Sequence, residues 1–228
     1  MRTLDKKLFI ALLAVILVLG ALIFLLLGGG DSGNSKTNDT NLDAGYGIEV
    51  VSVGSYTGPY MEDASDAEVN DILMIQVKNN GEQAVQYGEV TLTEESGETA
   101  LFKFSTLDVG QTMTVLEANK KEYNKDANYV AAMASNVALF TGTLNTYENQ
   151  LEIQPLDGGL NVKNISDKDI NGEIVIYFKD CNGDMLTGGI TYRGRIPSGI
   201  PAGSMTQLMS ENFTKENTKV MFITIDGE

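Results

Sequence analysis

The side chains best placed to bind a metal ion lie in one short acidic stretch, where oxygen-bearing residues recur at every second position. Asp180, Asn182 and Asp184 have the spacing that opens a calcium-binding loop. The remainder of such a loop is missing, because Met185 stands where glycine is needed and Thr191 where glutamate is needed. An Asn-Gly pair between apolar runs is also the strongest short signal for a β-hairpin. We therefore expect a hairpin turn here, with a calcium site as the alternative.

Residues for catalysis are scarce in this sequence. The chain has no histidine and one cysteine, which removes Ser-His-Asp and Cys-His catalysis and the usual ligand sets of zinc. No glycine-rich nucleotide motif is present, and the abundant acids show no spacing that selects a catalytic pair. We predict no catalytic residue, no cofactor-binding residue and no enzyme activity. Cys181 has only Lys179 nearby to lower its pKa, so we expect an inert thiol.

The acidic charge balance limits the classes of molecule that the protein can bind. Sixteen Lys and Arg residues face 31 Asp and Glu residues, a net charge of −15. Nucleic acid is excluded, because binding its phosphates requires a basic face. We expect the acidic stretch 62–71 to be a solvated loop, with a cation or a basic partner as the alternative. Tyr56, Tyr60 and Tyr87 are candidates for stacking on a glycan, or else for filling a core.

One element near the N-terminus places the protein in a membrane. Residues 8–27 are twenty residues without a charge, long enough for a helix to span a hydrocarbon core of about 30 Å. A cleaved signal would have a shorter apolar run and an A-x-A-like site after it. Basic residues occur in segment 1–7, and the first charge after the run is Asp31. The positive-inside rule therefore predicts a cytoplasmic tail at 1–7, a single transmembrane helix at 8–27 and an extracellular remainder.

Residues 28–45 are dominated by Gly, Ser, Asn, Asp and Thr, with Leu42 and Ala44 as the apolar exceptions. Such a segment cannot build a core, so we predict a flexible linker. A coil of this length spans about 20–25 Å, which would keep the folded part close to the bilayer.

Beyond residue 45 the apolar residues alternate in short β-branched runs separated by turn residues, which indicates an all-β fold. The predicted strands cover residues 48–53, 72–77, 89–93, 100–104, 111–116 and 129–140, followed by 150–154, 160–163, 173–178, 189–193, 205–209 and 219–225. The alanine-rich run 129–140 also suits a helix, but its repeat equivalent is strongly β-forming, so we prefer a strand.

The second set of strands repeats the first. Five matches occur in the same order: Val77-Lys78-Asn79 with Val162-Lys163-Asn164, Gly88-Glu89-Val90 with Gly172-Glu173-Ile174, Ser96-Gly97-Glu98 with Asn182-Gly183-Asp184, Met113-Thr114 with Met205-Thr206, and Tyr123 with Phe213. We predict two tandem Ig-like β-sandwich domains, at residues 46–147 and 148–228. Their expected cores are led by Val90, Leu92, Phe102 and Phe104 in the first and by Ile174, Ile176, Val220 and Phe222 in the second.

The second repeat resembles a known group of domains. Residues 160–172 form a strand that ends in Asn164 and leads through a polar turn, and residues 174–180 continue as an aromatic-acidic hairpin. This pattern resembles the FxLYD-type and related Ig-like domains of Gram-positive membrane-anchored proteins, although Tyr177 and Asp180 are separated by two residues here. The resemblance implies an extracytoplasmic binding or spacing role and no active site.

These features predict a non-enzymatic, membrane-anchored extracellular binding or assembly module, accessory to a protein complex of the cell envelope. The alternative is a structural spacer that contacts cell-wall polymer, and a carboxylate-dependent hydrolase comes third.

Overall fold

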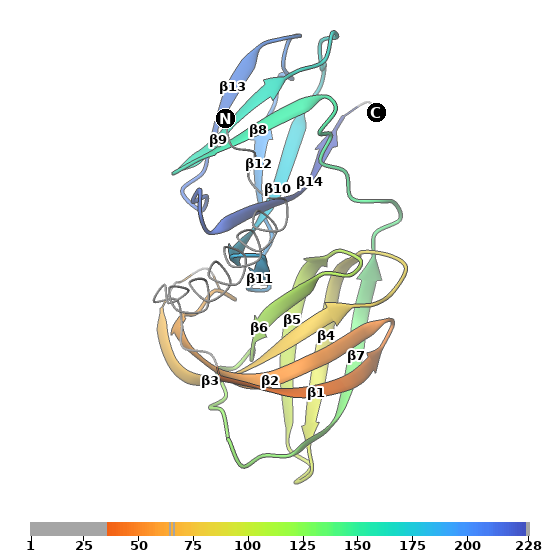
Figure 1. The fold of residues 1–228 in the computed structure, drawn as a ribbon, viewed down its shortest axis with the longest axis vertical. Helices are drawn as coiled ribbons and strands as arrows, with labels where there is room; N and C mark the ends of the chain where they lie inside the picture. The colour runs from red at the N-terminus through yellow and green to blue at the C-terminus, as the bar shows by residue number, and fades with distance from the viewer. Residues whose placement is uncertain (1–35, 64, 66, 227–228) are drawn as a thin grey trace, which may run out of the picture. The chain divides into compact units, whose positions relative to one another are not determined.

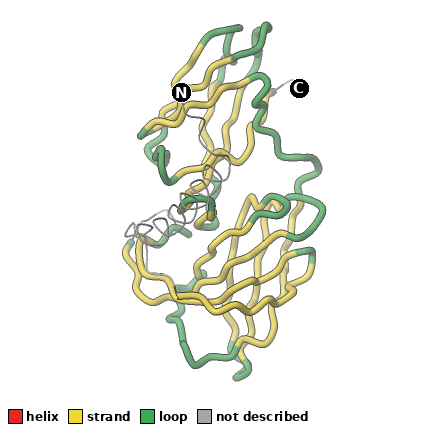
Figure 2. The backbone as a smooth tube through the Cα atoms, in the orientation of Figure 1, coloured by secondary structure: helices red, strands yellow, loops and turns green. Residues whose placement is uncertain are grey.

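A computed structural model describes residues 36–63, 65 and 67–226 of the chain. All regular structure in these residues is β-strand, which confirms the all-β prediction (Figure 2). The described part holds no helix long and apolar enough to cross a membrane. The predicted cytoplasmic tail at 1–7, the transmembrane helix at 8–27 and residues 28–35 of the predicted linker lie outside the described residues.

We divide the strands into a first and a second half at the connection that follows β7 (Figure 1). The first half contains β1 (Lys36–Gly45), β2 (Ile48–Pro59), β3 (Glu68–Asn79), β4 (Val85–Glu94), β5 (Thr99–Leu107), β6 (Thr112–Leu116) and β7 (Tyr129–Leu139). The second half contains β8 (Leu151–Leu156), β9 (Gly159–Asn164), β10 (Ile174–Asn182), β11 (Met185–Thr187), β12 (Tyr192–Ile196), β13 (Met205–Met209) and β14 (Thr218–Ile225).

The two halves share one pattern of strand pairing. In the first half β2-β3-β6 and β5-β4-β7 are neighbours in two sheets, and in the second half β8-β9-β13 and β12-β10-β14 are neighbours in the same relative order. All these pairs are antiparallel. The repeat seen in the sequence is therefore also a repeat of topology.

The described residues form two main hydrophobic clusters. The first draws on β1 to β7 and also takes in second-half side chains of β10, β11 and β14, namely Cys181, Leu186, Met221 and Phe222. The second is built from the second half alone, from β8, β9 and β13 together with β10, β12 and β14. Seven of the eight predicted core side chains pack as expected; they are Val90, Leu92, Phe102, Phe104, Ile174 and Ile176, all fully buried, and the partly buried Val220. Burial of such side chains stabilises a fold by about 1.5–3 kcal/mol each.

Phe222 is the exception, because it packs in the first cluster rather than the second. It pairs with Tyr177 across the β10–β14 ladder, so both rings project to the same side, and they stack with centroids 4.1 Å apart. Phe140 meets the Phe222 ring edge-on at 5.3 Å. The prediction placed Phe222 by strand membership alone, and strand membership does not determine which face a residue occupies.

A buried asparagine closes the same turn in each half. The Asn79 side-chain amide donates to the carbonyls of Gln83 and Leu107, and its Oδ1 accepts from the Gly81 N–H. In the second half Asn164 donates to the carbonyls of Lys168 and Ile200, and its Oδ1 accepts from the Ser166 N–H. Both asparagines are fully buried. The shared Val-Lys-Asn motif thus carries a shared structural role.

The predicted flexible linker is wrong over residues 36–45, which form β1 and pair with β2. The hairpin turns on Tyr46 and Gly47, both at positive φ (56° and 74°), as a two-residue turn between antiparallel strands requires. Leu42 and Ala44 project into the first cluster. The composition indicated a coil, but backbone pairing and two apolar side chains suffice for an edge strand.

Three other sequence predictions are settled by the strands. Residues 129–139 form a strand, as preferred. The strand expected at 189–193 begins later, at Tyr192, and the short β11 was not expected. The match of Met113 with Met205 is wrong by one residue: Val77 pairs with Met113, whereas its equivalent Val162 pairs with Thr206. A shift of one residue moves a side chain to the opposite face of the sheet.

Candidate functional site

The site that concentrates unusual chemistry lies where the two halves meet. Glu62 follows β2 and directs its carboxylate at two backbone N–H groups. Its Oε1 accepts from Leu116 in β6 at 2.9 Å, and its Oε2 accepts from Gly189 in the second half. One side chain therefore bonds to a strand of its own half and to a loop of the other.

Lys179 enters the same region from β10. Its side chain is fully buried, and its Nζ donates to the carbonyl of Ile190 at 2.8 Å. Ile190 follows directly on Gly189, so the carboxylate and the ammonium group bind the outer backbone N–H and C=O of two successive residues. We call Glu62, Lys179, Gly189 and Ile190 the junction.

Burial shifts both charges at the junction. Desolvation raises the pKa of Glu62 to about 7, although the N–H groups of Leu116 and Gly189 and the nearby Lys179 oppose the rise and Asp63 adds to it. Desolvation lowers the pKa of Lys179 to about 7, against the opposing influence of Glu62 and Asp180. Each group therefore titrates near neutral pH.

Hydroxyl groups and a strand pair complete the contact. Ser105 in β5 donates to the carbonyl of Gly189 at 2.5 Å and lies 2.9 Å from the Thr191 hydroxyl, which in turn donates to Thr106 at 2.9 Å. The short β11 pairs in parallel with β6, which joins the main sheets of both halves into one eight-stranded sheet. All described residues belong to one compact unit.

Beside the junction lies a pocket of about 350 Å³. Tyr60 forms part of its wall and donates its hydroxyl to the Glu117 carbonyl at 3.0 Å. Lys120 lies 4.2 Å from the centre of the Tyr60 ring and 3.4 Å from the Asp63 carboxylate. The Glu62 carboxylate has the pKa of a general acid, but both of its oxygens accept backbone N–H bonds. Its chemistry here is to hold structure in place.

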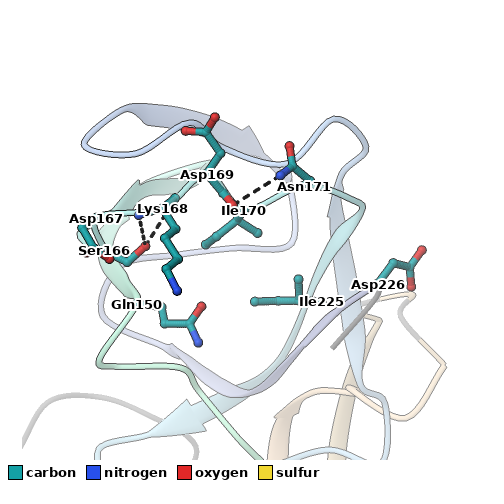
Figure 3. Close-up of a pocket in the computed structure, with 9 residues that line it drawn as sticks. All are labelled: Gln150, Ser166, Asp167, Lys168, Asp169, Ile170, Asn171, Ile225 and Asp226. Atoms are coloured by element: carbon teal, nitrogen blue, oxygen red, sulfur yellow. Dashed lines mark hydrogen bonds between the residues drawn. The ribbon is translucent and has the colours of Figure 1, made fainter.

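A second pocket, of about 480 Å³, opens in the second half over the turn that Asn164 closes (Figure 3). The Ser166 hydroxyl donates to the Lys168 carbonyl and the Asn171 side chain donates to the Asp169 carbonyl. The wall is therefore a loop that is stabilised by hydrogen bonds between its own residues. The acids on this wall are not gathered around a point. Among the described residues, no group of three or more acidic or thiol side chains is arranged to hold a metal ion.

The candidate calcium residues form a hairpin instead of a loop. Asp180 and Asn182 lie in β10, and Asn182 pairs with Met185 across a two-residue turn that contains Asp184. Gly183 takes a positive φ of 60° in that turn. The preferred hairpin prediction is confirmed.

The other singled-out residues have structural surroundings. Tyr60 is buried in a small cluster with Ile72, Met74 and Leu116, and Tyr56 packs against it. The Tyr87 hydroxyl donates to Glu89 at 2.7 Å. Cys181 is buried, and burial raises the pKa of its thiol, which disfavours the reactive thiolate.

Sequence reasoning missed the junction. It treated Glu62 as part of a solvated loop, which holds for the exposed Asp63 beside it but not for Glu62. Lys179 gave the clearer signal, because a lysine that follows five apolar or aromatic residues in a predicted strand has a buried environment on both sides.

No family model, curated protein or solved structure matches the chain.

Proposed function

We propose that this protein is a membrane-anchored, extracytoplasmic and non-enzymatic module that binds a protein partner in the cell envelope, as an accessory to a membrane complex. The anchor is the apolar segment 8–27, with the folded part outside the cell. Each half is proposed to be an Ig-like β-sandwich, which the shared strand order supports.

The observation that carries the proposal is the junction. Two copies of one fold would give two recognition surfaces, and the geometry between them decides whether one partner can engage both at once. Lys179 is fully buried and Glu62 is partly buried, and desolvation disfavours the charged form of both. Both groups lie where the two halves meet, so we infer that they fix the geometry of that contact rather than stabilise either half.

The alternative is a structural spacer that contacts wall polymer, for which two joined β halves would also suffice. A carboxylate-dependent hydrolase is the third candidate. It finds little support, because Asp63, the other described carboxylate on the wall of the pocket that Glu62 lines, is bonded to Ser65 and Lys120.

The test is crosslinking in living cells, followed by affinity purification of the full chain. A membrane protein recovered in stoichiometric amount supports the proposed function, and enrichment with purified wall material supports the spacer. Deletion of residues 46–228 with the anchor retained should abolish the partner's assembly. If the partner assembles and works normally without them, the accessory role is excluded.

The junction gives this test a sharper arm. Glu62→Ala removes both backbone contacts and should lower partner recovery several-fold, because the relation of the two surfaces is less tightly held without them. Glu82→Ala is the matched control, since Glu82 is an exposed acid of the first half. Equal recovery with both variants would separate partner binding from the junction.

A further inference from the structure

The outer margin of the second half is an unusual edge strand. β13 pairs with β9 and, among the described strands, with no other (Figure 1). Its sequence, Met-Thr-Gln-Leu-Met, carries no charge. Edge strands of soluble proteins are commonly protected by charged residues or proline, and β8 at the opposite margin of this sheet has both, in Glu152 and Pro155.

The outward face of β13 is apolar and exposed. Met205 is 56% exposed and Met209 is 68% exposed, whereas Leu208 between them is buried in the second cluster. Gln207 is exposed on the same face as the two methionines, because side chains alternate along a strand.

The first half indicates that this edge can accept another strand. The equivalent strand is β6, and its outer edge is paired with β11 at Met113 and Thr114. By their ladder partners, Thr206 and Gln207 are the equivalents of these two residues. The second half therefore repeats the edge, and none of the strands that the structure describes covers it there.

We propose that two copies of the chain associate through β13, antiparallel and edge to edge, with Gln207 on the two-fold axis. The strand is chemically close to a palindrome, so an antiparallel pair about Gln207 places Met205 opposite Met209 of the partner subunit. Thr206 then faces the partner subunit's Leu208, and the two Gln207 amides face each other. None of these pairs opposes like charges, and a two-fold axis makes the interface self-complementary.

The absence of charge on β13 favours a second copy of the chain as the partner of this edge. Each chain carries a net charge of −15, so two copies repel each other over most of their surface. An uncharged, self-complementary strand is a place where they can meet without that penalty, and it needs no oppositely charged partner. A five-residue ladder is small, so the dimer is weak and reversible. Added salt should strengthen it by screening the repulsion.

Site-specific crosslinking of the full chain in its membrane tests the register. In a Cys181→Ala background, Gln207→Cys should form an intermolecular disulfide under mild oxidant, because directly opposed residues in antiparallel strands have Cα atoms about 4.5–5.5 Å apart. Met205→Cys and Met209→Cys should crosslink with each other when coexpressed, and much less when each is alone. Gln154→Cys on β8 is the matched control, an exposed residue at the opposite margin of the same sheet.

The proposal is overturned if Gln207→Cys crosslinks no faster than Gln154→Cys. A second measurement leaves the strand without cysteine. Sedimentation of the purified full chain should show a concentration-dependent dimer that Met205→Lys with Met209→Lys weakens at least tenfold. Met133→Lys, on the exposed face of β7, should leave it unchanged. A dimer equally strong in the β13 double variant contradicts the assignment. This inference goes beyond the proposed function, because self-association requires no other protein.

Discussion

Asn79 and Asn164 occupy the same position in the two halves and make the same three kinds of hydrogen bond. Each donates to the carbonyl four residues ahead and to a carbonyl of a distant strand or loop, and each accepts from the N–H two residues ahead. Because both are fully buried, no water can replace these bonds without rearrangement.

Loss of either asparagine should destabilise the fold. Asn79→Ala and Asn164→Ala should each lower the free energy of unfolding by about 2–4 kcal/mol, because buried backbone groups lose their partners. Urea unfolding followed by circular dichroism measures the change. Asn171→Ala is the control, since Asn171 is exposed. A loss below about 0.5 kcal/mol at either buried site would mean that the turn holds without its asparagine.

Two glycines of the second half separate backbone strain from lack of space. Gly199 and Gly203 both have positive φ, 64° and 69°. A Cβ at Gly199 would collide with the carbonyl of Ile170, whereas one at Gly203 would meet nothing within 4 Å. Gly203→Ala should cost about 1 kcal/mol and Gly199→Ala clearly more, about 3 kcal/mol or above. Equal melting temperatures for the two variants would contradict this placement of the Ile170 carbonyl.

The junction predicts an unusual dependence of stability on pH. The pKa of Glu62 is raised from 4.5 to about 7, so its contribution to stability is greatest below pH 4.5 and is lost as the pH rises through 7. The pKa of Lys179 is lowered from 10.5 to about 7, so its contribution is greatest above pH 10.5 and is lost as the pH falls through 7. Together the two groups give a minimum near neutral pH.

Single variants isolate the two limbs of that profile. Relative to the wild type, Glu62→Gln should remove the fall in stability between pH 4.5 and 7, and Lys179→Met should remove the rise between pH 7 and 10.5. Denaturant unfolding at a series of pH values measures both. Wild-type and variant curves that run parallel across these windows would show that neither group is desolvated in the folded protein.

The proposed topology makes a cellular prediction. Protease added to intact protoplasts should remove the folded part and leave a small apolar stub in the membrane. A soluble form of the protein that begins within residues 28–33 would establish a cleaved signal instead of an anchor.

The repeat and most strands could be predicted from the sequence, because alternation of apolar residues reports directly on which face of a strand is buried. The prediction failed where side-chain pattern is a poor guide. β1 pairs along its length with β2 through backbone bonds, and two apolar residues, Leu42 and Ala44, are too few to predict a strand from the sequence. Met113 and Met205 match as residue types, but the strand pairing makes Thr206, one residue further on, the structural equivalent of Met113.

The junction could not be predicted, for a different reason. Glu62 and Gly189 are 127 residues apart in sequence, and their bond depends on how the two halves meet. Alternation describes each strand, and the repeat describes each half; neither contains information about the contact between halves. A lysine in the middle of an apolar strand, such as Lys179, was the one local sign of a buried charge.

We infer that the junction holds the two halves in a fixed relation. Spin labels at Met133→Cys in the first half and Gln154→Cys in the second, in a Cys181→Ala background diluted with unlabelled chain, report the distance between them by double electron-electron resonance. Both positions are exposed on strands. We expect one narrow distance distribution, which broadens several-fold in Glu62→Ala. A broad distribution in the chain with Glu62 intact would contradict the inference.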